Sequence, residues 1–185
     1  VGYAPRPRSL EAMREASETY FVKTHRQRDG DVDDTDKAIC LVRDGRDALV
    51  SWARLSSEGS AERFETALRA MILRDTERGT GSWGANVLSW RRPPAAHRII
   101  MRYEDLVAEP RDVVGGVMAS VAPELRPRDD VRLPTFDDLR QVDSGFFRRG
   151  ANGSHRDELP RELHELFWSR PDNVAAMELL GHRRD

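Results

Sequence analysis

Short apolar runs alternate with amphipathic stretches along this chain, and this alternation restricts its fold more than any other feature. The runs TYFVKTH (19–25), AICLVR (38–43) and HRIIMRY (97–103) have the length and residue types of β-strands. Residues 60–78 have a clear helical period, with apolar side chains three and four residues apart on one stripe. Strands separated by helices predict an α/β layer fold with a mainly parallel sheet flanked by helices.

Local signals predict further helices. Ser9 is a good N-cap for a short helix that reaches Ser17, and Pro110 suits the first turn of another. Gly181 suits the residue after the last helix, since glycine readily adopts a left-handed conformation. We also expect helices at 45–57, 83–91, 135–142, 160–168 and 171–180.

Length, charge and cysteine usage restrict the class of protein. At 185 residues the chain is most simply one domain, 1–185. The net charge of −2 argues against a nucleic-acid partner, so an anionic ligand has to be held by a local cluster of cations. The single cysteine, Cys40, lies in an apolar run, which favours a core thiol and a reducing, cytoplasmic location. No apolar run reaches the about 20 residues of a membrane span, so we expect no membrane partner.

Candidate site residues follow the expected strands. Ligands of parallel α/β sheets bind outside the carboxyl ends of the strands. Lys23 and His25 would share one face of their strand, where the lysine could stabilise negative charge and keep the imidazole neutral as a proton acceptor. Arg43 would project into the same crevice, and Ser51, about two turns into the next helix, could share a phosphate with it. Tyr103 ends the third run.

A Gly-rich basic loop, FFRRGANGSHR (146–156), offers another anion site. Arg148 and Arg149 stand beside Gly150, so guanidinium groups and backbone N–H groups could approach one phosphate together. An ordinary exposed basic loop would have the same composition.

Simpler interpretations stay open at the level of local sequence. Arg43 could pair with Asp44 or Asp47, and the other cationic side chains could be solvated surface groups. The Asp-rich loop 26–37 lacks the spacing and terminal Glu of a calcium loop. No two histidines have metal-ligand spacing and one cysteine supplies no zinc set, so we expect no bound metal.

Together these segments resemble the sulfotransferases that use 3′-phosphoadenosine 5′-phosphosulfate (PAPS). FVKTH is similar to the family's strand with a catalytic lysine and histidine, and CLVRDGRDALVSW to its 3′-phosphate motif. MRYEDLVAEP is similar to the segment whose tyrosine lies near the adenine, and FFRRGANGSHRDEL to the C-terminal Arg-Lys-Gly loop. The order agrees with the family over roughly residues 19–182. His155 stands where the family often has tryptophan, and Arg149 where it has lysine.

The resemblance implies a P-loop-NTPase-like fold that transfers a sulfuryl group from PAPS to a hydroxyl or amine, without a metal. The product nucleotide would be adenosine 3′,5′-bisphosphate (PAP), and the acceptor a small molecule or glycan; the oligomeric state stays open. The resemblance also implies that His25 is the base and that Lys23 stabilises the leaving oxygen. It assigns nucleotide binding to Arg43, Ser51, Tyr103, Arg148, Arg149 and Gly150.

The family's Gly/Ser/Thr-rich loop for the 5′-phosphosulfate has no counterpart before Phe21. We therefore expect this chain to be the C-terminal portion of a longer sulfotransferase, with a naturally shortened relative as the alternative. Two other functions stay open. An inactive domain of sulfotransferase ancestry would bind PAP or PAPS, or serve in interactions, without turnover. A nucleoside or small-molecule kinase would need a Walker-type loop and magnesium ligands, which this sequence does not show.

Overall fold

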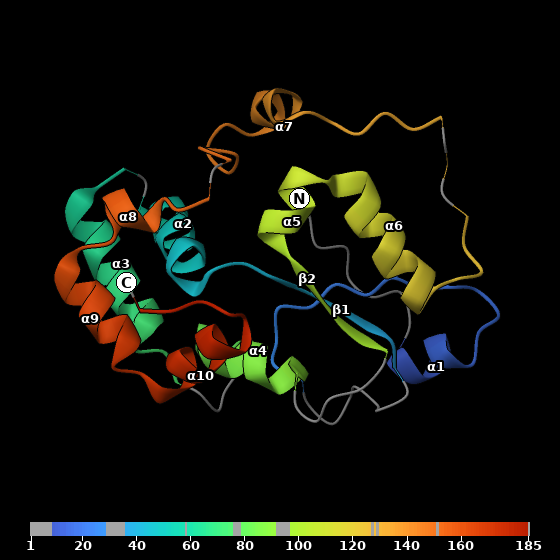
Figure 1. Cartoon of the computed structure of the whole chain (residues 1–185), viewed down its shortest axis with the longest axis horizontal. Helices are drawn as coiled ribbons and strands as arrows, with labels where there is room; N and C mark the ends of the chain where they lie inside the picture. The colour runs from blue at the N-terminus through green and yellow to red at the C-terminus, as the bar shows by residue number, and fades with distance from the viewer. Residues whose placement is uncertain are drawn as a thin grey trace.

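The structure is a computed structural model that describes residues 9–28, 36–57, 59–75, 79–91, 97–126, 128, 130–150 and 152–184. Figure 1 shows its elements in chain order. They are α1 (Leu10–Arg14), β1 (Ala38–Val42), α2 (Gly45–Ser57), α3 (Ala61–Ile72), α4 (Trp83–Arg91), β2 (Arg98–Arg102), α5 (Tyr103–Ala108), α6 (Pro110–Val121), α7 (Phe136–Val142), α8 (His155–Glu158), α9 (Arg161–Trp168) and α10 (Pro171–Leu179).

The two strands form a parallel pair, as the sequence predicts. Ala38 lies opposite Arg98 and Val42 opposite Arg102, so the carboxyl ends of both strands meet at one edge. Helices α4 and α6 each contact both strands. In Figure 1, α4 lies below the pair and α6 above it. The predicted α/β fold with a parallel sheet flanked by helices is therefore confirmed.

The largest buried cluster lies among α2, α3, α9 and α10, beside the carboxyl ends of the strands. Phe64, Leu68 and Ile72 form the buried stripe of α3, which confirms the predicted helical period. Phe167 of α9 packs against the same stripe and is 1% exposed. This cluster packs α2 against α3, α9 and α10.

Two glycines allow helices to approach closely, one where α2 meets α4 and one where α4 meets α10. A Cβ on Gly45 would lie 2.6 Å from the Trp83 ring, and a Cβ on Gly84 would lie 2.4 Å from the backbone carbonyl carbon of Asp172. The Gly84 N–H also donates to Asn173 Oδ1 at 3.1 Å. Helix α4 is therefore packed closely against both α2 and α10.

The segment 19–25 is not a strand, and this prediction was wrong. Its side chains are mostly exposed, with Phe21 at 69%. Its neighbouring backbone groups bond to α4 side chains: His25 O accepts from Asn86, and Arg26 O from Trp90 Nε1. Thr24 Oγ1 accepts from the Arg26 N–H, which favours a local turn. Since these groups bond to side chains and a local turn, the segment is held in an irregular conformation.

Candidate active site

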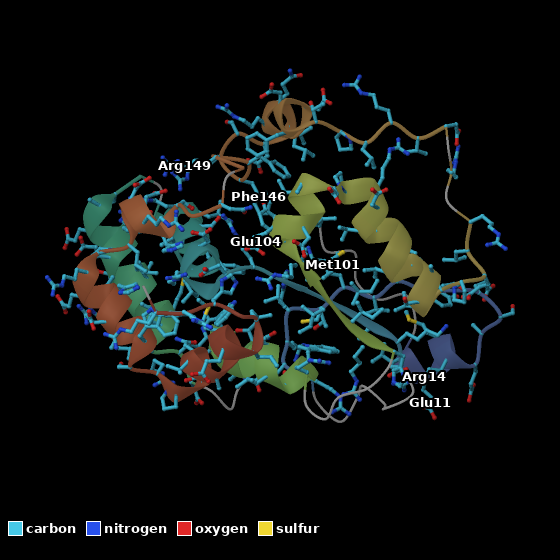
Figure 2. The ribbon with its side chains drawn as sticks, in the orientation of Figure 1. Glu11, Arg14, Met101, Glu104, Phe146 and Arg149 are labelled. Atoms are coloured by element: carbon cyan, nitrogen blue, oxygen red, sulfur yellow. The ribbon has the colours of Figure 1, made fainter. Side chains whose placement is uncertain are left out.

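Two of the predicted site residues meet at the carboxyl ends of the parallel strands. Arg43 follows β1 and Tyr103 follows β2, and the Arg43 guanidinium lies 4.7 Å from the centroid of the Tyr103 ring. Such a cation–π contact orients the guanidinium group of the arginine. Figure 2 labels Glu104 beside this edge. Glu104 Oε1 accepts from the Asp44 N–H at 3.1 Å, which ties the turn after β1 to α5.

Asp44 organises the turn between β1 and α2. It is 6% exposed, and its carboxylate accepts from the Arg46 backbone N–H at 2.9 Å and from Arg46 Nη2 at 2.9 Å. His182 Nδ1 lies 3.6 Å from the same carboxylate. Burial opposes ionisation of Asp44, but the hydrogen bonds and charge of Arg46 outweigh it and lower the pKa of this carboxyl. The negative charge compensates the positive end of the helix.

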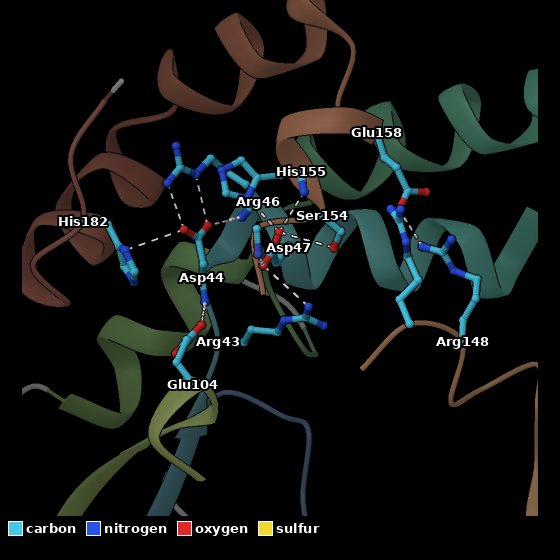
Figure 3. A network of polar contacts seen from close by, with 12 residues as sticks. Arg43, Asp44, Arg46, Asp47, Glu104, Arg148, Ser154, His155, Glu158 and His182 are labelled. Carbon is cyan, nitrogen blue, oxygen red and sulfur yellow. Dashed lines mark hydrogen bonds and ion pairs between the residues drawn. The ribbon is translucent and has the colours of Figure 1, made fainter. Parts of the chain in front are cut away.

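Asp47, in the first turn of α2, holds the loop that precedes α8 (Figure 3). It is 1% exposed; Oδ2 accepts from the Gly153 N–H at 2.6 Å, and Oδ1 from the His155 N–H at 2.8 Å. Oδ1 also lies 2.7 Å from His155 Nδ1, and Arg43 Nη2 lies 3.5 Å from Oδ2. Burial opposes ionisation, but these hydrogen bonds and the Arg43 charge lower the pKa of Asp47 to about 2. One of the simpler interpretations, an Arg43–Asp47 ion pair, is therefore present.

Ser51 lies on the same side of α2, between two points at which α8 is attached. Asp47, Ser51 and Arg54 follow at helical spacing, so they share one face. Asp47 holds the start of α8, and Arg54 Nε donates to Glu158 Oε2 at 2.8 Å at its end. Ser51 itself is exposed, so its hydroxyl is accessible to a ligand between these points.

Glu158 gathers three arginines at the end of α8. Besides Arg54, its carboxylate accepts from Arg148 Nη2 at 2.8 Å and from Arg149 Nη1 at 2.7 Å. Burial opposes ionisation of Glu158, but these hydrogen bonds lower the pKa of its carboxyl. Three guanidinium groups on one carboxylate leave an excess of positive charge, and each guanidinium keeps further N–H donors. The group is therefore suited to an additional anion.

Gly150 is required by the conformation of this loop. Its φ is 59°, in the left-handed region that glycine adopts most readily. A Cβ at this position would lie 2.4 Å from Cε2 of Phe136. Figure 2 shows Arg149 and Phe146 on the same segment, between α7 and α8. The glycine lets the chain turn directly after the two arginines.

Lys23 and His25 lie on the irregular segment, so their common face does not come from strand geometry. The His25 ring packs edge-on against Trp52 of α2, with 6.3 Å between ring centroids. Burial and the nearby positive charge of Lys23 both lower the pKa of His25. The lysine therefore favours the neutral imidazole, in the direction that the sequence predicts. Trp52 follows Ser51, so His25 reaches the part of α2 that carries the candidate serine.

Comparison with known proteins places this chain in a family. A family model described as the sulfotransferase domain matches residues 3–119, which is more than half of the chain. The chain belongs to the sulfotransferase family. The matched region includes Lys23, His25, Arg43, Ser51 and Tyr103, and it ends before the basic loop.

The fold of this chain is similar to that of a solved sulfotransferase structure. Mouse sulfotransferase SULT7A1, complexed with PAP, matches with a TM-score of 0.57 at 17% sequence identity. The alignment covers 78% of this chain and 63% of the mouse chain. This chain therefore matches less than two thirds of that protein's length. A search of curated protein sequences gives no match.

Several residues of the sulfotransferase domain's candidate site were not singled out from the sequence. The sequence predicts Asp47 only as a possible partner of Arg43, and it does not predict Glu158 or Arg54 as site residues. The i, i+4 spacing of Arg43 and Asp47 was the available signal for one pair. Nothing local indicates that Glu158 would collect arginines from α2 and from the basic loop, because those contacts join distant segments.

The described residues also bear on three expectations from the sequence, which concern a bound metal, a membrane span and the role of Cys40. Among those residues, no group of three or more His, Cys, Asp or Glu is arranged to hold a metal ion. Most of the Asp-rich loop considered for calcium lies outside the described residues. No described helix is long and apolar enough to cross a bilayer. Burial raises the pKa of the Cys40 thiol to about 11, which disfavours a nucleophilic thiolate at neutral pH.

Proposed function

We propose that this domain binds PAPS and transfers its sulfuryl group to a hydroxyl or amine of a small-molecule or glycan acceptor. The observation that carries the proposal is the contact of Arg43 with Tyr103 at the carboxyl ends of the parallel strands, within a sulfotransferase fold. An arginine fixed on an aromatic ring at this edge can bind a phosphate while the ring lies near a base.

The 3′-phosphate of the nucleotide would lie along the face of α2 that carries Ser51. Arg43 would bind it at the start of the helix, and Ser51 would donate its hydroxyl about two turns later. Arg148 and Arg149 would reach it from the basic loop, where their side chains are 41% and 45% exposed. Gly150 would let the backbone come close to the same phosphate. Tyr103 would lie near the adenine.

The transfer itself would be an in-line displacement at sulfur. The acceptor oxygen or nitrogen forms a bond to sulfur while the bond from sulfur to the bridging phosphate oxygen breaks, and PAP leaves with that electron pair. His25 takes the acceptor proton, for which its lowered pKa keeps it in the neutral form. Lys23 stabilises the negative charge that develops on the leaving oxygen.

Binding can be tested by calorimetric titration of the chain with PAP, with adenosine 5′-monophosphate and the Arg43→Ala variant as comparisons. A charge-assisted hydrogen bond contributes about 1.5 to 3 kcal/mol, so we expect Arg43→Ala to weaken PAP binding about ten- to a hundredfold. The monophosphate, which lacks the 3′-phosphate, should bind far less tightly. Failure of the folded chain to bind PAP would remove the nucleotide site and the proposal with it.

A second candidate function is a domain that binds PAP or PAPS without turnover. The observation that favours it is the position of Lys23 and His25 on an exposed, irregular segment rather than on a strand. An assay of sulfuryl transfer from PAPS to a panel of phenols, amines and glycans separates the two. Transfer that is lost in His25→Ala supports the enzyme, and PAP binding without any transfer supports the binding domain.

A further inference from the structure

The basic loop is attached to α2 by one buried carboxylate. Asp47 accepts hydrogen bonds from the backbone N–H groups of Gly153 and His155, and its carboxylate also bonds to the ring Nδ1 of His155. Asp47 and His155 are 1% and 7% exposed, so this contact is shielded from water. Figure 3 shows Asp47 of α2 next to Ser154 and His155 at the start of α8, with Arg43 on its other side.

The chemistry of the pair assigns the proton on the imidazole. The pKa of Asp47 is lowered to about 2, so its carboxylate is ionised at neutral pH and can only accept hydrogen bonds. His155 Nδ1 must therefore carry a proton. His155 Nε2 is buried and has no hydrogen-bond partner among the described residues.

The attachment sets the position of Arg148 and Arg149. Only a few residues separate these arginines from Gly153, and the end of α8 is fixed to α2 through Glu158 and Arg54. With its two ends fixed, α8 lies along the face of α2 that carries Ser51, and the two arginines precede this fixed helix directly. If the contact with Asp47 were lost, the arginines would stay attached to α8 but the loop would no longer be held at the start of α2.

We propose that Asp47 and His155 are positioning residues for the nucleotide: they hold the basic loop against α2 so that Arg148 and Arg149 reach the phosphate bound by Arg43. This inference rests on the proposed function. In this proposal, Asp47 and His155 act through the loop and not on the nucleotide itself. Their contribution to affinity therefore depends on the two arginines being present.

A double-mutant cycle with PAP as the probe tests this dependence by calorimetry. In the otherwise unmodified chain, Asp47→Asn should weaken PAP binding about tenfold, comparable with loss of one charge-assisted hydrogen bond. In an Arg148→Ala/Arg149→Ala background the same substitution should change the affinity less than about twofold. Equal weakening in both backgrounds would show that Asp47 acts independently of the loop and would overturn the inference.

A second pair of variants keeps the test decisive if Asp47→Asn does not fold. His155→Leu removes the ring donor, whereas the amide nitrogen of His155→Asn can replace Nδ1. We expect the leucine variant to lose PAP affinity several-fold and the asparagine variant to recover most of it. A merely structural role would lower the stability of the leucine variant without changing the affinity of its folded fraction, and that result overturns the inference.

Asp157→Asn provides the matched control. It is the same change of side chain and charge, on an exposed residue of α8 next to the attachment, and it should leave PAP affinity unchanged. Failure of the unmodified chain to bind PAP would overturn the proposed function and this inference together. Normal PAP binding by the unmodified chain, with native affinity in Asp47→Asn and His155→Leu, would overturn the positioning role alone.

Discussion

The guanidinium of Arg43 lies 4.7 Å from the centroid of the Tyr103 ring, so the residues that follow two adjacent parallel strands are in direct contact. The contact depends on the register of the strands, in which Val42 pairs with Arg102. It orients the arginine that we propose as a phosphate ligand before any nucleotide is bound.

Removing the aromatic ring should therefore weaken nucleotide binding. We expect Tyr103→Leu to reduce PAP affinity about two- to fivefold, since a cation–π contact contributes about 0.5 to 1 kcal/mol. Tyr103→Phe keeps the ring and should bind PAP nearly as the unmodified chain does. Calorimetry on the three proteins measures this, and equal affinities for all three would contradict the orienting role.

Ionisation of Asp47 should make the free energy of unfolding depend on pH in the acid range. Its pKa is about 2 in the folded chain against 3.8 ordinarily, so folding favours the ionised form. The stabilisation is present above pH 3.8 and disappears as the pH falls through about 2. The shift corresponds to about 2 kcal/mol at neutral pH. The unfolding free energies of the unmodified chain and Asp47→Asn should therefore converge between about pH 5 and pH 2; a constant difference would contradict the assignment.

The pKa of His25 should depend on Lys23. Lys23→Met removes a nearby positive charge, so the pKa of His25 should rise, although the effect of burial remains. Titration of the His25 ring by NMR measures the change directly. Lys37→Met removes the same type of charge from an exposed position elsewhere and should leave His25 unaffected. If His25 is the base, the acid limb of the transfer rate should move to higher pH in Lys23→Met.

Two glycine substitutions should have opposite effects on stability, because only one of these glycines lies at a close contact between helices. Gly84→Ala would bring a Cβ within 2.4 Å of the Asp172 backbone, which cannot move aside as a side chain can. We expect a loss of about 1 to 3 kcal/mol in the free energy of unfolding. Gly115→Ala, in α6, meets nothing within 4 Å and should gain about 0.5 to 1 kcal/mol. Thermal or denaturant unfolding distinguishes them, and a neutral Gly84→Ala would contradict the packing.

Much of the fold was predictable because its signals are local. Helices α2 and α4 span the predicted residues, since periodicity and turn residues lie within each segment. Ser9 and Pro110 begin helices α1 and α6 as predicted, and Gly181 follows α10. The motif residues of the candidate site could be chosen in the same way, because their types and order resemble a family pattern.

Tertiary structure decided what depends on partners far away in the sequence. The residues of 19–25 have strand propensity, but a strand needs a partner, and α4 side chains bond to this segment instead. Asp47 accepts hydrogen bonds from the segment at the start of α8, and Glu158 accepts hydrogen bonds from three arginines on two distant segments. Local sequence determines conformational preference within a few residues. Which buried carboxylate meets which donor is decided by packing, because a buried charge is stable only where distant segments supply its hydrogen bonds.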